Sequence, residues 1–166
     1  MRGSGVFVII KTRTTQLPKY IHTVMRDEED EDLKIYQRVG AEALFAIFPL
    51  VVVAIVFSYE GRFLDLLKTP EWSFAAAVLS GQSLVKLLSG AANLKEEANY
   101  IFIGLVGSFL FVFVLGPSIV TLTYIILSTN ISSYIGISQV IIFLMSISTL
   151  FIVGGHGQRW IDEGEI

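Results

Sequence analysis

The sequence contains no cysteine, only two histidines and few charged residues, which make up 16% of the chain against about a quarter of a typical globular protein. Without cysteine the chain has no disulfide framework and no thiolate metal site. The histidines, His22 and His156, have no acidic residue at ligand spacing, so no metal site is predicted. The glycine cluster Gly154–Gly157 is not followed by the Lys-Ser/Thr of a phosphate-binding loop, and no cofactor is expected.

Apolar residues are abundant instead, at 53% of a 166-residue chain. A soluble fold of this size keeps a large surface relative to its volume and cannot bury so much apolar surface. Lipid is therefore the expected solvent and the first expected partner. The formal net charge of −3 and the lack of a basic, aromatic-interleaved patch argue against a nucleic-acid partner.

Four apolar segments are long enough to cross roughly 30 Å of hydrocarbon. They are residues 41–59, 72–93, 100–127 and 131–153, of which the second is the least hydrophobic. The sequence thus predicts an all-α integral membrane protein, built as a bundle of four transmembrane helices. A short N-terminal region (1–40) would precede the transmembrane domain (41–153), and a short tail (154–166) would follow it.

The distribution of lysine and arginine predicts the orientation of these spans, because cytoplasmic loops carry an excess of both. Nine of these residues would lie on the side of the two termini, namely Arg2, Lys11, Arg13, Lys19, Arg26, Lys34, Arg38, Lys95 and Arg159. Only Arg62 and Lys68 would lie on the opposite side. We expect both termini in the cytoplasm and the spans in a bacterial inner (plasma) membrane.

The N-terminal region is expected to consist of several short pieces. Val6–Ile10 could be a strand or a membrane-surface segment, Lys11–Gln16 is expected to be a loop, and Leu17–Met25 has the apolar spacing of an amphipathic helix. Six consecutive acids follow and are expected to stay solvated and extended. These acids, a possible docking patch for a basic cytoplasmic protein, are Asp27, Glu28, Glu29, Asp30, Glu31 and Asp32.

The second span carries a polar stripe. Its members Gln82, Lys86, Ser89 and Asn93 are separated by four, three and four residues and so share one helical face. Since lipid cannot satisfy polar groups, this face should point to the protein interior or to an aqueous path. Three interpretations of Lys86 remain open: it could line a pore, bind neighbouring helices, or extend its charge to the headgroups.

Other polar and small residues are candidates for helix packing. The pairs Ala77 with Gly81 and Gly104 with Ser108 are four residues apart and would permit close approach of helices, and Gln139 and Ser146 recur at a heptad spacing in the fourth span. Gln139 is expected to form a hydrogen bond to a neighbouring helix.

Proline and glycine residues predict irregularities of the helical backbone at three places in the chain. Pro49 should kink the first span, and Gly116-Pro117 offers a break in the third, so that these residues could act as hinges. Gly154–Gly157 is expected to stop the fourth span. Between the first two spans, Phe63–Lys68 suggests a short interfacial helix ended by Pro70, with Trp72 at the headgroups.

Acidic residues are absent from the interior of the predicted spans. Glu42 is expected at the start of the first helix, where it would complement the helix dipole. A small proton-coupled antiporter would be expected to carry a carboxylate in its spans, and no hydrolase motif is present. A non-enzymatic protein is therefore expected.

Three functions fit this sequence. The preferred hypothesis is a homo-oligomeric channel or switchable pore lined by the second span, because four short spans enclose too little space for a channel in one subunit. The alternative is a membrane anchor or sensor that docks a cytoplasmic effector, for instance in a prokaryotic antiviral defence or stress system. A small-solute transporter, hinged at Pro49 and Gly116-Pro117, is the third.

Overall fold

The computed structural model describes the backbone of residues 6–94, 100–128 and 130–164. Side chains are described for residues 33–94, 100–128 and 130–162. In this part of the chain the fold consists of helices joined by short turns. Within these residues, four helical segments are long and apolar enough to cross a membrane: Leu33–Tyr59, Glu71–Asn93, Tyr100–Leu127 and Ser133–Asp162. The protein is therefore an integral membrane protein with a four-helix bundle. The chain divides into two compact units, residues 1–36 and 37–166, and the bundle belongs to the second.

Helix α1 (Val6–Tyr59) runs without interruption through 54 residues. The expected strand or surface segment at Val6–Ile10, the loop at Lys11–Gln16 and the extended acidic run are therefore wrong, since all three lie in this helix. Residues 6–32 include two lysines, two arginines and three glutamates, which lose little side-chain freedom in a helix, and the region continues the helix of the first span.

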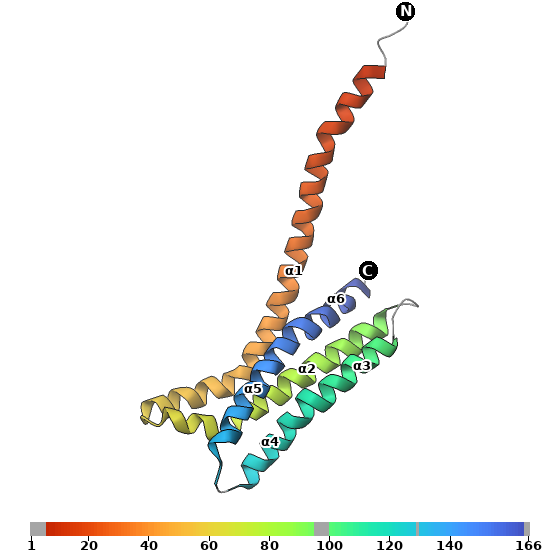
Figure 1. Cartoon of the computed structure of the whole chain (residues 1–166). Coiled ribbons are helices and arrows are strands. Elements are labelled where there is room, and N and C mark those ends of the chain that lie inside the picture. The colour runs from red at the N-terminus through yellow and green to blue at the C-terminus, as the bar shows by residue number, and fades with distance from the viewer. Residues whose placement is uncertain (1–5, 95–99, 129, 165–166) are drawn as a thin grey trace, which may run out of the picture. The chain divides into compact units, whose positions relative to one another are not determined.

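The membrane part of α1 has two distinct faces. Val39, Ala43, Ala46 and Leu50 recur at helical spacing and are buried, while the opposite face exposes large side chains such as Phe45 and Phe48. The helix continues through Pro49, and Figure 1 shows that it bends within the part that belongs to the bundle. A proline inside a helix removes one backbone hydrogen bond and favours such a bend.

The connection after α1 contains the short helix predicted there, a 3₁₀ helix η1 (Phe63–Lys68). Gly61 (φ 70°) adopts the left-handed conformation in the turn before it, a conformation that glycine reaches without steric cost. Trp72 donates from Nε1 to the carbonyl of Leu66 (2.9 Å) and packs edge-on against Phe143. The indole therefore fastens this connection to the bundle.

Helix α2 (Glu71–Asn93) is the central helix of the bundle. It contacts every later helical segment and lies between the α3–α4 span and the α5–α6 span (Figure 1). Half of the residues in its most hydrophobic stretch are buried, against 22–28% in the corresponding stretches of the other three spans. Its low hydrophobicity follows from this position, because the buried face consists largely of small residues that let neighbouring helices approach.

The third span comprises α3 (Tyr100–Leu110), the π-helical segment η2 (Phe111–Leu115) and α4 (Gly116–Leu127). The predicted irregularity at Gly116-Pro117 is thus present as a π-helical turn immediately before it. Pro117 cannot donate a backbone hydrogen bond, and a π turn accommodates the carbonyl group left without its usual donor. A short connection then leads to α5, where the Ser132 hydroxyl caps the helix by accepting from the Tyr134 amide.

The fourth span comprises α5 (Ser133–Thr149), the π-helical segment η3 (Leu150–Gly154) and α6 (Gly155–Gly164). The prediction that Gly154–Gly157 stops this helix is wrong, because the helix continues through all four residues. The glycines allow helix packing instead: a Cβ on Gly157 would lie 2.5 Å from the Lys86 carbonyl oxygen, and one on Gly90 would collide with Gly157. Tight contact with α2 offsets the low helix propensity of glycine.

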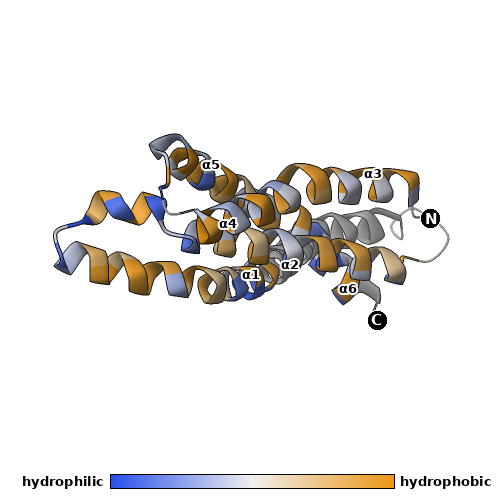
Figure 2. Cartoon of the chain, turned by 90° about the horizontal axis from the view of Figure 1, so that it is seen from below, coloured by the Kyte–Doolittle hydropathy of each residue, from blue (hydrophilic) through white to orange (hydrophobic). Residues whose placement is uncertain are grey.

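The outward faces of the spans are apolar. Figure 2 shows hydrophobic residues along the spanning helices and hydrophilic residues gathered at the connection between α1 and η1. Exposed side chains include Phe45, Leu105, Phe113, Val120 and Ile141. In a bilayer these faces contact lipid, which accounts for the exposure of large apolar side chains in the isolated chain.

Candidate functional site

Among the described residues of the bundle, Lys86 is the one buried cation. It lies near the C-terminal end of α2 and is only 8% exposed. Its Nζ lies 3.0 Å from Glu42 Oε1 of α1 and donates a second hydrogen bond of 3.0 Å to Gln158 Oε1 of α6. A buried ammonium group requires such partners, because its desolvation is otherwise costly. Three helices thus meet at one charged side chain.

Two further residues extend this contact toward the surface. Gln158 donates from Nε2 to Asp162 Oδ1 (2.9 Å), and the same oxygen lies 3.1 Å from Arg38 Nη1 of α1. Arg38, Glu42, Lys86, Gln158 and Asp162 form what we call the interhelical network. It holds two cations and two anions and is therefore neutral.

The two ion pairs of the network differ in exposure. Arg38 and Asp162 are 64% and 35% exposed, and an exposed pair of this kind contributes about 0–1 kcal/mol. The side chain of Lys86 is 10% exposed and that of Glu42 is 39% exposed. The inner pair, which joins α1 to α2, is therefore stronger than the outer pair, which joins α1 to α6 and mainly fixes the position of Asp162.

Glycines on α6 make the inner contact sterically feasible. Gly157 packs against the backbone of Lys86 and Leu87, and Gly154 lies beside Ser83 and the Lys86 side chain. With α6 this close to α2, Gln158 is within hydrogen-bonding distance of the ammonium group. The glycine cluster and the polar network therefore form one structural unit.

Glu42 does not have the role that its sequence position suggested. The helix begins at Val6 rather than near residue 41, so Glu42 lies in the helix interior and within the span Leu33–Tyr59. Its carboxylate is the ion-pair partner of Lys86. The expectation of a dipole-complementing acid at a helix start is wrong.

The predicted polar stripe of α2 is divided among different environments. Lys86 is buried in the network, whereas Ser89 and Asn93 are exposed. Gln82 is partly buried, and its Oε1 has no hydrogen-bond partner among the described residues. The stripe therefore provides one interhelical contact, one unsatisfied amide and two polar groups at the chain surface.

A second buried polar contact involves Gln139. It is fully buried, accepts from Ser73 Oγ of α2 (2.9 Å) and donates from Nε2 to the Leu67 carbonyl of η1 (3.0 Å). The predicted hydrogen bond to a neighbouring helix is confirmed. Gly136, one turn earlier, packs directly against the Leu67 backbone, so α5 holds the connection between the first two spans.

The remaining packing candidates behave differently from one another. Ser146 is fully buried, and its hydroxyl donates to the Ile142 carbonyl of its own helix. A Cβ on Gly81 or Gly104 would meet no atom of the described chain within 4 Å. Ala77 is half-buried and Ser108 is exposed. The close helix approach within this chain instead occurs at Gly90, Gly136 and Gly157.

The candidate docking residues Asp27, Glu28, Glu29, Asp30, Glu31 and Asp32 belong to the backbone of α1, but their side chains lie outside the described residues. The hinge candidates Pro49, Gly116 and Pro117 are all half-buried positions within helical spans. Their role as hinges stays a prediction.

The sequence contained a signal for the network. Arg38 with Glu42 and Gln158 with Asp162 are each four residues apart, so each pair shares one helical face. A lysine in a span needs an anion on a neighbouring helix, and Glu42 is the only acid between Asp32 and Glu60.

Comparison of the chain with protein-family models, with curated proteins and with solved structures finds no match.

Proposed function

We propose that this protein is a non-enzymatic membrane anchor or sensor that couples the extramembrane part of α1 to its four-helix bundle and docks a cytoplasmic effector. The observation that carries this proposal is the inner ion pair of the interhelical network, in which Glu42 of α1 binds Lys86 of α2 with Gln158 of α6 as third partner.

The length of α1 supports a coupling role. The spanning part of α1, Leu33–Tyr59, has 27 residues, which at about 1.5 Å per residue already exceeds the roughly 30 Å of the hydrocarbon core, and the helix contains further residues from Val6 onward. The helix therefore has to continue well beyond the lipid. A change at its extramembrane part is transmitted to the bundle when the helix is fixed to its neighbours, and the network supplies such a fixation between α1, α2 and α6.

The position of Lys86 gives less support to a pore lined by α2. A lysine that selects anions must face an aqueous path, and here it is buried in an ion pair. Helix α2 also lies between the other spans of its own chain. The pore hypothesis stays a prediction, and the experiment below includes an outcome that would favour it.

The proposal includes a setting for the protein. The lysine and arginine distribution favours cytoplasmic termini in a bacterial inner membrane, where the acidic run Asp27–Asp32 can bind a basic effector, as in a defence or stress system. A homo-oligomer is part of the proposal, because Gly81 and Gly104 leave open surface on α2 and α3 within the described chain.

The docking proposal is tested by in-cell crosslinking of the full chain and a variant in which all six acids of Asp27–Asp32 become Asn or Gln. As a matched control, Glu60 in the turn before η1 and Asp65 within η1 are neutralised in the same way. A cytoplasmic protein should crosslink to the wild-type chain and the control, and at least tenfold less to the six-acid variant.

Two results would contradict this function. Equal crosslinking of all three proteins would show that the acidic run does not bind the effector. An ion flux through reconstituted protein whose anion preference inverts in Lys86→Glu would show that α2 lines a path, and would favour the pore instead.

A further inference from the structure

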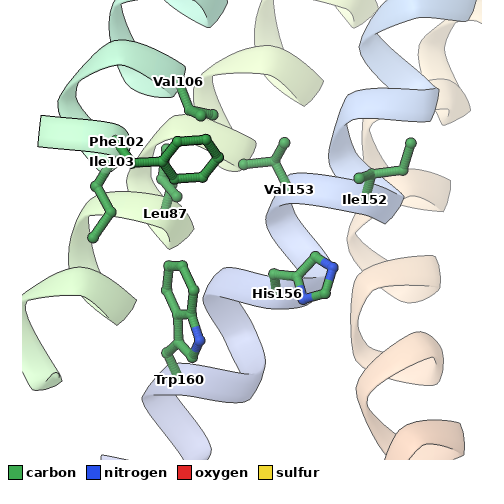
Figure 3. A pocket seen from close by; sticks show the side chains of 8 residues that line it. All are labelled: Leu87, Phe102, Ile103, Val106, Ile152, Val153, His156 and Trp160. Atoms are coloured by element: carbon green, nitrogen blue, oxygen red, sulfur yellow. The ribbon is translucent and has the colours of Figure 1, made fainter. Parts of the chain in front are cut away.

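A narrow apolar groove opens on the side of the bundle, between α3 and the η3–α6 segment (Figure 3). Its volume is about 370 Å³. Its floor is made of buried side chains, Leu87 of α2 and Ile103 of α3, which are 3% and 6% exposed. Phe102 and Ile152 form an exposed rim. The groove is thus a depression in the packed core that is open to the surroundings of the spans.

The chemistry of the groove is uneven along its length. Val106 and Val153 contribute only hydrocarbon, while the two polar rings, His156 and Trp160, both come from α6 at one end. Figure 3 shows the six-membered ring of Trp160 turned toward Leu87. Within the described residues, no hydrogen bond holds the indole N–H, so this donor is available to an external acceptor. A long apolar body with one polar end matches this arrangement.

The size of the groove restricts its occupant. One turn of an α-helix with side chains fills on the order of 400 Å³, from a pitch of about 5.4 Å and a diameter of about 10 Å. The groove is comparable in volume to one such turn, so a helix of several turns from another protein cannot enter it. A slender, flexible chain can, and the groove lies in spans that are surrounded by such chains.

We propose that this groove binds one acyl chain of a membrane phospholipid, with the ester region of that lipid at Trp160. The terminal carbons would lie against Val106 and Ile103, and a glycerol ester carbonyl would accept the indole N–H. Tryptophan favours this level of the bilayer because its ring is apolar and its N–H is polar. The proposal concerns a bound lipid and does not depend on the docking of an effector.

The chain offers a direct optical test, because it contains only two tryptophans. In a Trp72→Phe background, Trp160 is the sole tryptophan and can be excited selectively over the tyrosines at the long-wavelength edge of its absorption, and Phe preserves a ring next to Phe143. The full-length protein in detergent is titrated with phosphatidylcholine carrying bromine on its acyl chain, which quenches tryptophan at short range. Quenching should saturate at a few lipids per protein.

Val106→Phe, which fills the groove, should raise the lipid-to-protein ratio at half-saturation at least tenfold. Val120→Phe is the matched control, since Val120 is 68% exposed on α4 and does not line the groove. It should leave the ratio unchanged. If Val106→Phe does not fold, Val153→Phe fills the groove from the opposite wall, and native mass spectrometry of the wild-type protein counts retained lipids without any substitution.

Quenching that rises linearly without saturation, or that is unaffected by both groove-filling variants, would overturn the proposal. The proposal would also be overturned if the wild-type protein were an oligomer, Val106→Phe were a monomer, and quenching were the same in both. The groove would then hold a side chain of a second copy. If neither variant folds, linear quenching and no retained lipid in the wild-type protein would overturn it.

Discussion

Lys86 and Gln82 are one turn apart on α2 but differ in how their polar groups are satisfied. Lys86 has both an anion and an amide oxygen as partners, whereas the Oε1 of Gln82 has none among the described residues. A buried polar group without a partner costs about 1–3 kcal/mol, and one with partners is costly to remove. Identical substitutions at these two positions should therefore have opposite effects.

We predict that Lys86→Met lowers the free energy of unfolding by about 1–3 kcal/mol, because it leaves Glu42 and Gln158 without their shared donor. Gln82→Met should be neutral or should stabilise by up to about 1 kcal/mol, because it removes an unsatisfied oxygen. Both values can be measured by reversible unfolding in mixed SDS micelles. Equal destabilisation by the two variants would contradict the described partners.

Glycines of the 154–157 cluster offer a second test at residue scale. Gly157→Ala should destabilise the protein by about 1–3 kcal/mol, since its methyl group would collide with the Lys86 backbone. Gly155→Ala is the matched control, because a Cβ there meets no described atom within 4 Å. It should be neutral or slightly stabilising, since alanine has the higher helix propensity. Similar losses in both variants would argue against close α2–α6 packing.

Part of the site was predictable from the sequence, namely the buried polar residues Lys86 and Gln139. Lys86 and Gln139 stand out because polar side chains are rare in apolar segments. The partners of Lys86 were not predicted, because Glu42 was placed at a helix start and Gln158 beyond a helix stop. Both errors concern helix bounds, which local glycine content and charge determine only weakly when tertiary packing stabilises a longer helix.

The connection η1 shows how individual side chains position a whole element. It is held by Trp72 of α2 and by Gln139 and Gly136 of α5. Gln139 is fully buried and contacts both α2 and η1. Interhelical hydrogen bonds in lipid contribute about 0.6 kcal/mol on average and up to about 1.7 kcal/mol, so the effect of Gln139 should be local more than global.

We predict that Gln139→Met lowers the unfolding free energy by only about 1 kcal/mol but increases amide hydrogen exchange in residues 63–69 at least tenfold. Ser138→Ala serves as the control, because its hydroxyl bonds only to Ile135 of the same helix. Unchanged exchange in the connection would mean that Gln139 does not hold η1.

The helices also show where sequence periodicity is sufficient. The third span was predicted at the residues where it is found, because its 28 residues carry no charge and have a short connection at each end. The fourth was predicted to end at Val153, but its helix continues through α6 to Gly164. The segment α6 is polar on average, so a scan for apolar segments does not detect it, and its extensive contact with α2 supports the helix.

At the scale of the whole molecule, the bundle is organised around its least hydrophobic helix. Helix α2 uses serine, alanine and glycine to contact the other spans, while the more apolar helices face outward (Figure 2). A hydrophobicity scan therefore identifies the outer helices most clearly and the central helix least clearly. The polar residues of α2 serve contacts between helices, and in the sequence alone the same residues suggest a pore lining.

Orientation in the membrane is testable because the chain lacks cysteine. A single cysteine at Ser128, in the connection between α4 and α5, should react with an impermeant maleimide on intact cells. A single cysteine at Lys11 should react only after permeabilisation, as the lysine and arginine distribution predicts. The reverse pattern of labelling would contradict cytoplasmic termini.

The most direct test of the central claim is a charge exchange between α1 and α2. Glu42→Lys and Lys86→Glu, made singly, each place two like charges in contact and should lower the unfolding free energy in SDS micelles. The double variant restores opposite charges, and we predict that it recovers at least half of the summed loss, a coupling of about 1–3 kcal/mol. Losses that simply add in the double variant would contradict an ion pair between Glu42 and Lys86.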